Sequence, residues 1–139
     1  MIMGISLKVI MQLRGEIMEK LITLSRDMVE LSNTIKEGLE HLDKRLADGH
    51  LEDSYYLFQD IVQAFYSVTR AMESVQSSIE IDTVVQAADK LLNAFEKLSI
   101  SYEDQKLNQA RMDLQLILSP ALSAWSNELH KCLQPIMES

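Results

Sequence analysis

Apolar residues recur at intervals of three and four along most of the chain, which is the period of an amphipathic α-helix. The first such line begins after Met18 and has Gly38 at its one missing step; it runs through Leu21, Leu24, Met28, Leu31, Ile35 and Leu42. Leu39 and Leu46 widen it. The pattern predicts a long helix that ends at Ala47, with Gly49 in the left-handed position that follows many helices.

The second and third predicted helices span residues 51–78 and 83–98. The second has the most regular core line: Phe58, Ile61, Phe65, Val68, Met72, Val75 and Ile79. The third is short, and its line is Val84, Ala88, Leu91, Phe95 and Leu98. Residues 99–101 are expected to close the third helix.

The last predicted helix begins at Ser101, an N-cap residue followed by acidic side chains. It has two apolar lines: Leu107, Ala110, Leu114, Ile117, Ala121 and Ala124, and Leu118, Leu122, Trp125, Leu129, Leu133 and Ile136. Pro120 lies inside this pattern and predicts a kink near residues 118–119, because proline removes one helical hydrogen bond.

Four amphipathic helices with short connections predict an all-α protein, an antiparallel up-down four-helix bundle formed by residues 18–139 as one domain. Because the third helix is predicted to be short, part of the long helices would stay uncovered. That surface would be available to a partner or to a second copy.

Residues 1–17 differ from the rest of the chain, since only Lys8, Arg14 and Glu16 are charged among many apolar side chains. The stretch is too short to span a bilayer and does not have the layout of a signal peptide. Two interpretations stay open. The segment is an N-terminal continuation of the first helix, or translation starts at Met18, since the codons for residues 14–16 can resemble a bacterial ribosome-binding site.

Composition narrows the functional classes. The 139 residues include 13 basic and 21 acidic side chains, a net charge of −8, which argues against nucleic acid or an anionic membrane as the main partner. A single cysteine indicates a reducing compartment, so we expect a cytoplasmic protein. The four scattered glycines form no phosphate-binding loop. We therefore expect no cofactor, no small-molecule substrate and no enzymatic activity.

The three histidines are His41, His50 and His130. Three histidines can hold a metal inside a four-helix bundle, as in the DinB-like families, where two of the ligands are typically one turn apart on one helix. No two histidines share a helix at that spacing here. The metal alternative therefore requires the three side chains to converge in space.

His41 also begins the sequence His41-Leu42-Asp43-Lys44-Arg45, which resembles the His-x-x-Lys-Gly motif of histidine phosphotransfer domains. Those domains are small acidic four-helix bundles with an exposed histidine. The resemblance implies that His41 would accept a phosphoryl group and that Lys44 would help to neutralise it. Arg45 stands where the family has a glycine that gives a partner close access.

The clearest remaining feature is a cluster of aromatic side chains in the second predicted helix. Tyr55, Val62 and Tyr66 form a second stripe beside the core line, and Tyr56 points away from the core. Tyrosines are enriched where proteins meet partners. The sequence thus predicts a non-enzymatic protein–protein interaction module, like a small chaperone or regulator, or a homodimer, with Tyr55, Tyr56, Val62 and Tyr66 at the contact. Packing of this flank inside the bundle is the alternative.

Overall fold

The computed structural model describes residues 6–138, and it is a four-helix bundle without β-strands in that range. The elements in chain order are α1 (Leu7–Ala47), α2 (Tyr55–Met72), α3 (Asp82–Glu103), α4 (Leu107–Asp113), a π-helical segment η1 (Leu114–Leu118) and α5 (Ser119–Met137). Because α4, η1 and α5 follow one another directly, they form the fourth helix of the bundle. The predicted all-α class and four-helix bundle are confirmed.

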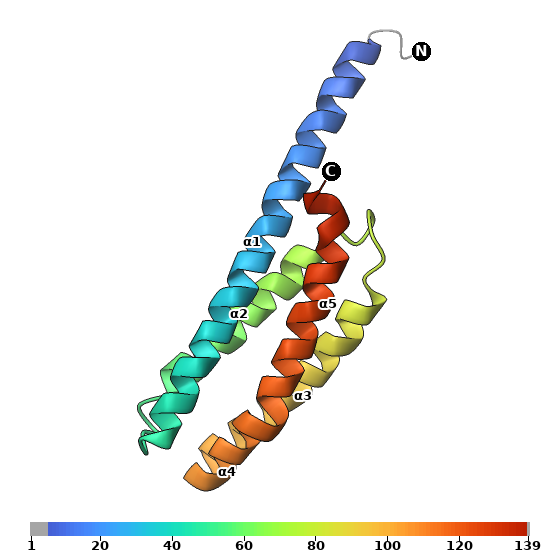
Figure 1. Cartoon of the computed structure of the whole chain (residues 1–139). Coiled ribbons are helices and arrows are strands. Elements are labelled where there is room, and N and C mark those ends of the chain that lie inside the picture. The colour runs from blue at the N-terminus through green and yellow to red at the C-terminus, as the bar shows by residue number, and fades with distance from the viewer. Residues whose placement is uncertain (1–5, 139) are drawn as a thin grey trace.

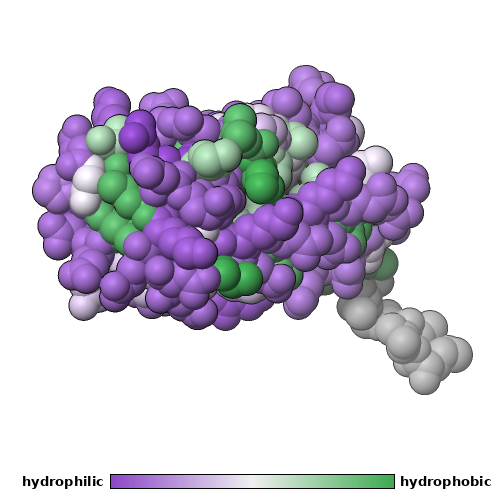
Figure 2. Space-filling view, turned by 90° about the horizontal axis from the view of Figure 1, so that it is seen from below, coloured by the Kyte–Doolittle hydropathy of each residue, from purple (hydrophilic) through white to green (hydrophobic). Residues whose placement is uncertain are grey.

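The helices do not approach one another equally closely. The helix α1 packs along α2 and α5, and α3 packs along α5, whereas α2 and α3 come close at only a few positions. Figure 1 shows the α1–α2 and α3–α4 connections at one end of the bundle, and the α2–α3 connection near the C-terminus. Figure 2, seen from below that view, shows a mostly hydrophilic face with separate apolar areas.

The end of α1 is set by Gly49, as predicted. Gly49 has a φ of 87°, in the left-handed region that favours glycine. The Gly49 N–H donates to the Leu46 carbonyl and the His50 N–H donates to the Arg45 carbonyl. This pair of bonds is a Schellman motif, which satisfies carbonyls that the helix end would otherwise leave unpaired.

The buried face of α1 differs in part from the predicted core line. Leu21, Leu24 and Leu31 are only half-buried, whereas Ser25 and Ser32 are fully buried. Serines escaped the prediction because a polarity pattern does not count them as core residues. The Ser32 hydroxyl donates to the Val29 carbonyl, a bond that offsets the cost of its burial.

Gly38 occupies the missing step of the α1 line because α2 passes close to it. A Cβ atom at this position would come within 3.1 Å of Ile61 Cγ1. The glycine thus lets the Ile61 side chain approach the α1 backbone. The helix α2 is shorter than the predicted 51–78, since it spans Tyr55–Met72. The predicted core residues from Phe58 to Val75 are buried, although Val75 follows the end of α2, and Ile79 is only half-buried.

The third helix is longer than predicted. It continues to Glu103 and is longer than α2, so the expectation of a short third helix ending near residue 99 was wrong. Ser101 is not the N-cap of the next helix but a buried residue of α3. The helix ends through Gln105, whose φ of 55° takes the role that Gly49 plays in α1. A glutamine in that conformation carries no recognisable sequence signal.

Pro120 lies in the first turn of α5, directly after the π-helical segment. The chain stays helical through it. A wider π-helical turn accommodates the ring and the missing N–H of a proline within a continuous helix. The kink of the fourth helix and the up-down order of the bundle stay predictions.

The N-terminal part of α1 extends beyond the other helices (Figure 1). All residues from 7 to 20 are exposed, and residues 7–17 belong to α1. Residues 1–5 lie outside the described residues, and a start at Met18 stays a prediction. Within residues 6–138, no helix combines the length and the apolar character that crossing a membrane requires.

Candidate functional site

A hollow with largely apolar walls lies between α2 and α3. It has a volume of about 340 Å³. The α2 side contributes Tyr55, Phe58, Gln59, Val62, Gln63 and Tyr66, and the α3 side contributes Leu92, Phe95, Glu96 and Ser99. Val62 and Leu92 are half-buried and Tyr66 is 43% exposed, so apolar surface stays open to solvent here.

Aromatic rings explain why α2 and α3 stay apart. Ring centroids of Phe65 and Phe95 are 5.4 Å apart, and those of Phe58 and Tyr102 are 5.2 Å apart, each pair bridging the two helices. The distance between packed helices increases with the size of the side chains between them. Large rings therefore connect α2 to α3, and the hollow lies beside these rings, between the two helices.

A second hollow of about 280 Å³ adjoins the first one and shares Tyr55 with it. Its other lining residues are Leu51, Glu52, Tyr102, Glu103 and Gln105. We call the two hollows together the α2–α3 groove. Its lining includes Glu52, Glu96 and Glu103 and, among the described residues that line it, no lysine or arginine. The groove is therefore apolar with acidic edges.

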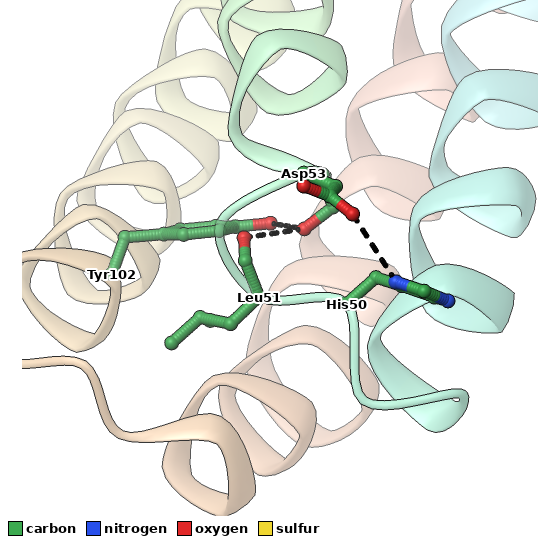
Figure 3. Close-up of polar contacts among 5 residues, drawn as sticks. His50, Leu51, Asp53 and Tyr102 are labelled. Carbon is green, nitrogen blue, oxygen red and sulfur yellow. Dashed lines mark hydrogen bonds and ion pairs between the residues drawn. The ribbon is translucent and has the colours of Figure 1, made fainter.

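Tyr102 fixes one end of the groove through a chain of hydrogen bonds (Figure 3). Its hydroxyl lies 2.7 Å from Ser54 Oγ, and the Ser54 hydroxyl donates to the Leu51 carbonyl at 2.9 Å. Since Ser54 has a single hydroxyl proton, Tyr102 is the donor to Ser54. Burial raises the pKa of Tyr102 above its ordinary value of 10.0. Nearby, His50 Nδ1 lies 3.3 Å from Asp53 Oδ2.

The structure brings three of the four predicted contact residues together. Tyr55, Val62 and Tyr66 all line the α2–α3 groove. Tyr56 does not line it and is 77% exposed. The α3 contribution was missed, since the sequence analysis assigned Phe95 to the core line of its helix and named no contact residue there. Which face of α3 would meet which face of α2 is not encoded in either helix alone.

The three histidines lie on different parts of the fold. His41 is exposed on α1, His50 follows α1 in the connection to α2, and His130 is half-buried on α5 with Nε2 3.4 Å from Ser32 Oγ. Residues 6–138 contain no group of three or more His, Cys, Asp or Glu side chains that could hold a metal. The geometric condition of the DinB-like alternative is therefore not met. Burial and Lys36 lower the pKa of His130 below 6.5.

His41 and Lys44, the residues of the phosphotransfer alternative, are both exposed on α1. Neither residue lines the α2–α3 groove. The resemblance to histidine phosphotransfer domains requires an exposed histidine, and His41 meets that requirement.

A buried polar cluster that no sequence pattern predicted connects α3 to α4. The Ser101 hydroxyl donates to Asp113 Oδ2, and the Gln109 amide donates to Asp113 Oδ1 at 2.8 Å. Asp113 is only 5% exposed. Both its oxygens are bonded to neighbouring side chains, so the cluster is a structural tie between the two helices.

The fold is an all-helical bundle in which α2 and α3 approach each other at only a few positions and leave a groove between them. The chain belongs to the family described as Domain of unknown function (DUF8042), which matches residues 23–128. The matched range contains the whole α2–α3 groove and excludes the exposed residues 7–20. No curated protein and no solved structure matches the chain.

Proposed function

We propose that this protein is a non-enzymatic interaction module that binds an amphipathic helix in the α2–α3 groove. The observation that carries the proposal is the apolar lining left open between two helices, formed by Val62 and Tyr66 from α2 and Leu92 from α3. Binding of an apolar helix face in such a groove is a recurrent mode of recognition. Removal of this surface from water supplies the driving force.

The shape and chemistry of the groove support a helix as the ligand. Rigid aromatic side chains such as Tyr55 and Tyr66 provide large contact areas at low entropic cost. Gln59, Gln63 and Ser99 provide polar groups at the edges, as the rim of an interface requires. A module of this kind would act as a small chaperone or regulator in the cytoplasm and would need no cofactor.

Two tyrosines on the same helix provide a matched test. Tyr66 lines the groove and Tyr56 does not. Wild-type protein, Tyr66→Ala and Tyr56→Ala would be used to capture partners from the cells of origin, and each captured protein would be identified and its affinity measured. We expect about tenfold or more weaker binding for Tyr66→Ala, and unchanged binding for Tyr56→Ala. Equal binding by all three proteins would exclude the groove as the binding site.

Phosphotransfer through His41 is the second candidate, supported by the exposure of His41 and Lys44 on one helix. Its test is phosphorylation of the full chain by a phosphorylated receiver domain, followed by detection of an acid-labile phosphohistidine. The candidate requires a label on wild-type protein that His41→Gln lacks. An unlabelled wild-type protein would exclude this donor class, and the groove proposal would be unaffected.

A further inference from the structure

We infer that the helix bound in the α2–α3 groove is the exposed N-terminal part of α1, residues 7–20, from a second copy of the chain. The inference rests on the proposed function of the groove and names its ligand. The same chain thus carries both an unfilled apolar groove and an unpacked apolar helix.

The exposed part of α1 has the surface of a helix that is normally packed. Its large apolar side chains that face solvent are Leu7, Val9, Ile10, Met11, Leu13, Ile17 and Met18. Of these, Leu7, Met11 and Met18 continue the face that α1 buries in the bundle, at multiples of seven residues before Met28 and Ser32. The other four lie on a neighbouring part of the helix surface, and the exposed Arg14 interrupts the line that starts at Leu7. A short helix without a packing partner is marginal in water, so this segment gains stability from being covered.

The length of the segment matches the groove. Residues 7–20 span about 20 Å at ~1.5 Å per residue. The groove runs along the chain from Leu51, before α2, to Tyr66 within it, a comparable number of residues. The segment can therefore lie along the full groove with its apolar side chains toward Val62, Leu92 and Phe95.

The charges are complementary as well. Residues 7–20 carry Lys8, Arg14 and Lys20 against Glu16 and Glu19, so three basic minus two acidic side chains give +1 in a chain of net charge −8. The groove has glutamates at its edges and no basic residue in its described lining. Opposite charges at the rim orient partners and raise the rate of association.

A second copy is required because α1 is one continuous helix from Leu7 to Ala47. Its exposed end points away from the bundle (Figure 1), so it does not reach the groove of its own chain. Two copies can each insert their segment into the groove of the other. Such a reciprocal pair is closed by a twofold axis and leaves neither surface free.

The experiment uses the full-length chain and two variants changed only at exposed positions. The helix variant, Ile10→Glu and Ile17→Glu, places charges on the apolar face of the segment. The groove variant, Gln59→Trp and Gln63→Trp, fills the groove with side chains of its own. Gln12→Glu on the polar face of α1 and Asp60→Trp on α2 are the matched controls. Circular dichroism checks that every variant keeps its helices.

Sedimentation over a concentration series measures self-association. We expect wild-type protein and both controls to dimerise, and each variant alone to have a dissociation constant raised by about tenfold or more. An equimolar mixture of the two variants should associate more tightly than either variant alone, because the intact segment of the groove variant fits the open groove of the helix variant. It should stay weaker than wild type, because only one of the two reciprocal contacts is restored.

Three results would overturn the inference. A groove variant that dimerises like wild type would mean that two exposed segments pair with each other. A native chain whose mass begins at Met18 would lack most of the ligand. A monomeric wild-type protein would remove the second copy as the ligand, while the Tyr66→Ala and Tyr56→Ala comparison would still decide whether the groove binds another helix.

Discussion

The α1–α5 and α2–α3 pairs show two ways of closing one bundle. Along α1, small side chains such as Ser25 and Ser32 are fully buried, and Ser32 lies against His130 of α5. Between α2 and α3, Phe65, Phe95 and Tyr102 bridge a wider gap. Small residues allow helices to pack closely and exclude solvent, whereas bulky rings leave space at the edge.

Under the proposed function, the tightly packed pair would serve stability and the open pair would serve recognition. A closely packed pair has no room for a ligand, and its side chains contribute to the free energy of unfolding. In a pair held apart by aromatic rings, the two backbones come close at fewer positions. Such a pair leaves an apolar groove of the kind that can bind a helix. Under the proposed function, the two roles fall on opposite sides of the bundle, since α1 contacts both α2 and α5 while α3 contacts mainly α5.

The largest expected effect on stability comes from comparing a leucine-to-alanine change in the buried core with one in the α2–α3 groove. Leu129 of α5 is fully buried, and Leu92 of α3 lines the groove half-buried. Leu129→Ala should lower the free energy of unfolding by about 2–5 kcal/mol through lost burial and a cavity. Leu92→Ala should cost roughly 1 kcal/mol, because its site already opens to solvent. Urea denaturation measures both, and equal losses would contradict the contrast between the two sides.

The next largest effect on stability comes from enlarging a side chain instead of truncating one. Ser32→Leu forces extra volume into the contact between α1 and α5 and should destabilise the protein by about 1–3 kcal/mol. Ser99→Leu makes the same change in the α2–α3 groove, where space exists, and should stay within about 0.5 kcal/mol of wild type. Thermal unfolding of the two variants gives the comparison. A neutral Ser32→Leu would show that the first contact is not tight.

A smaller effect on stability is expected at the end of the groove that Tyr102 lines. Tyr102→Phe removes the hydroxyl bonded to Ser54 and should cost about 1 kcal/mol. Burial raises the pKa of Tyr102 in the folded state, so the unfolded chain loses this proton first as the pH rises above 10. Wild-type stability should therefore fall through that range. Urea midpoints at pH 9 and 11 should show a smaller fall for Tyr102→Phe, unless Tyr102 is not the group responsible.

The smallest effect concerns His130 beside Ser32. Its pKa is lowered in the folded state by burial and by Lys36, so the unfolded chain binds the proton first as the pH falls. Stability is then fully present above pH 6.5 and declines as the pH drops through 6.5 toward the lower folded-state pKa. Chemical denaturation at pH 7.5 and 5.5 should show this decline in wild type and less of it in His130→Gln. An unchanged decline in the variant would assign it to other groups.

Much of the fold could be predicted because helical patterns are local. The spacing of the core residues from Phe58 to Val75 identified α2, and Gly49 marked the end of α1 through its backbone freedom. The errors occurred where a residue departed from its usual preference. Gln105 ends α3 in a conformation typical of glycine, and buried Ser101 resembled an N-cap.

The sequence predicted the α2 side of the candidate site but not the α3 side. The α2 stripe of Tyr55, Val62 and Tyr66 follows from the helical period of a single segment, and the exposure of His41 follows from the same rule. The position of α3 was needed to find the residues on the other side of the groove, Leu92 and Phe95. It was also needed to show that Tyr56 does not line the groove. No spacing within one helix encodes the rotation of its neighbour.

The sequence by itself determined the helices, most of their buried faces and the acidic character of the protein, because each depends on residue type and on short intervals along the chain. Only the tertiary structure decided which helix pair closes tightly and which stays open. That outcome depends on the combined volumes of side chains from segments far apart in sequence, such as Ser32 against His130 and Phe65 against Phe95. Such volumes meet only when the helices pack.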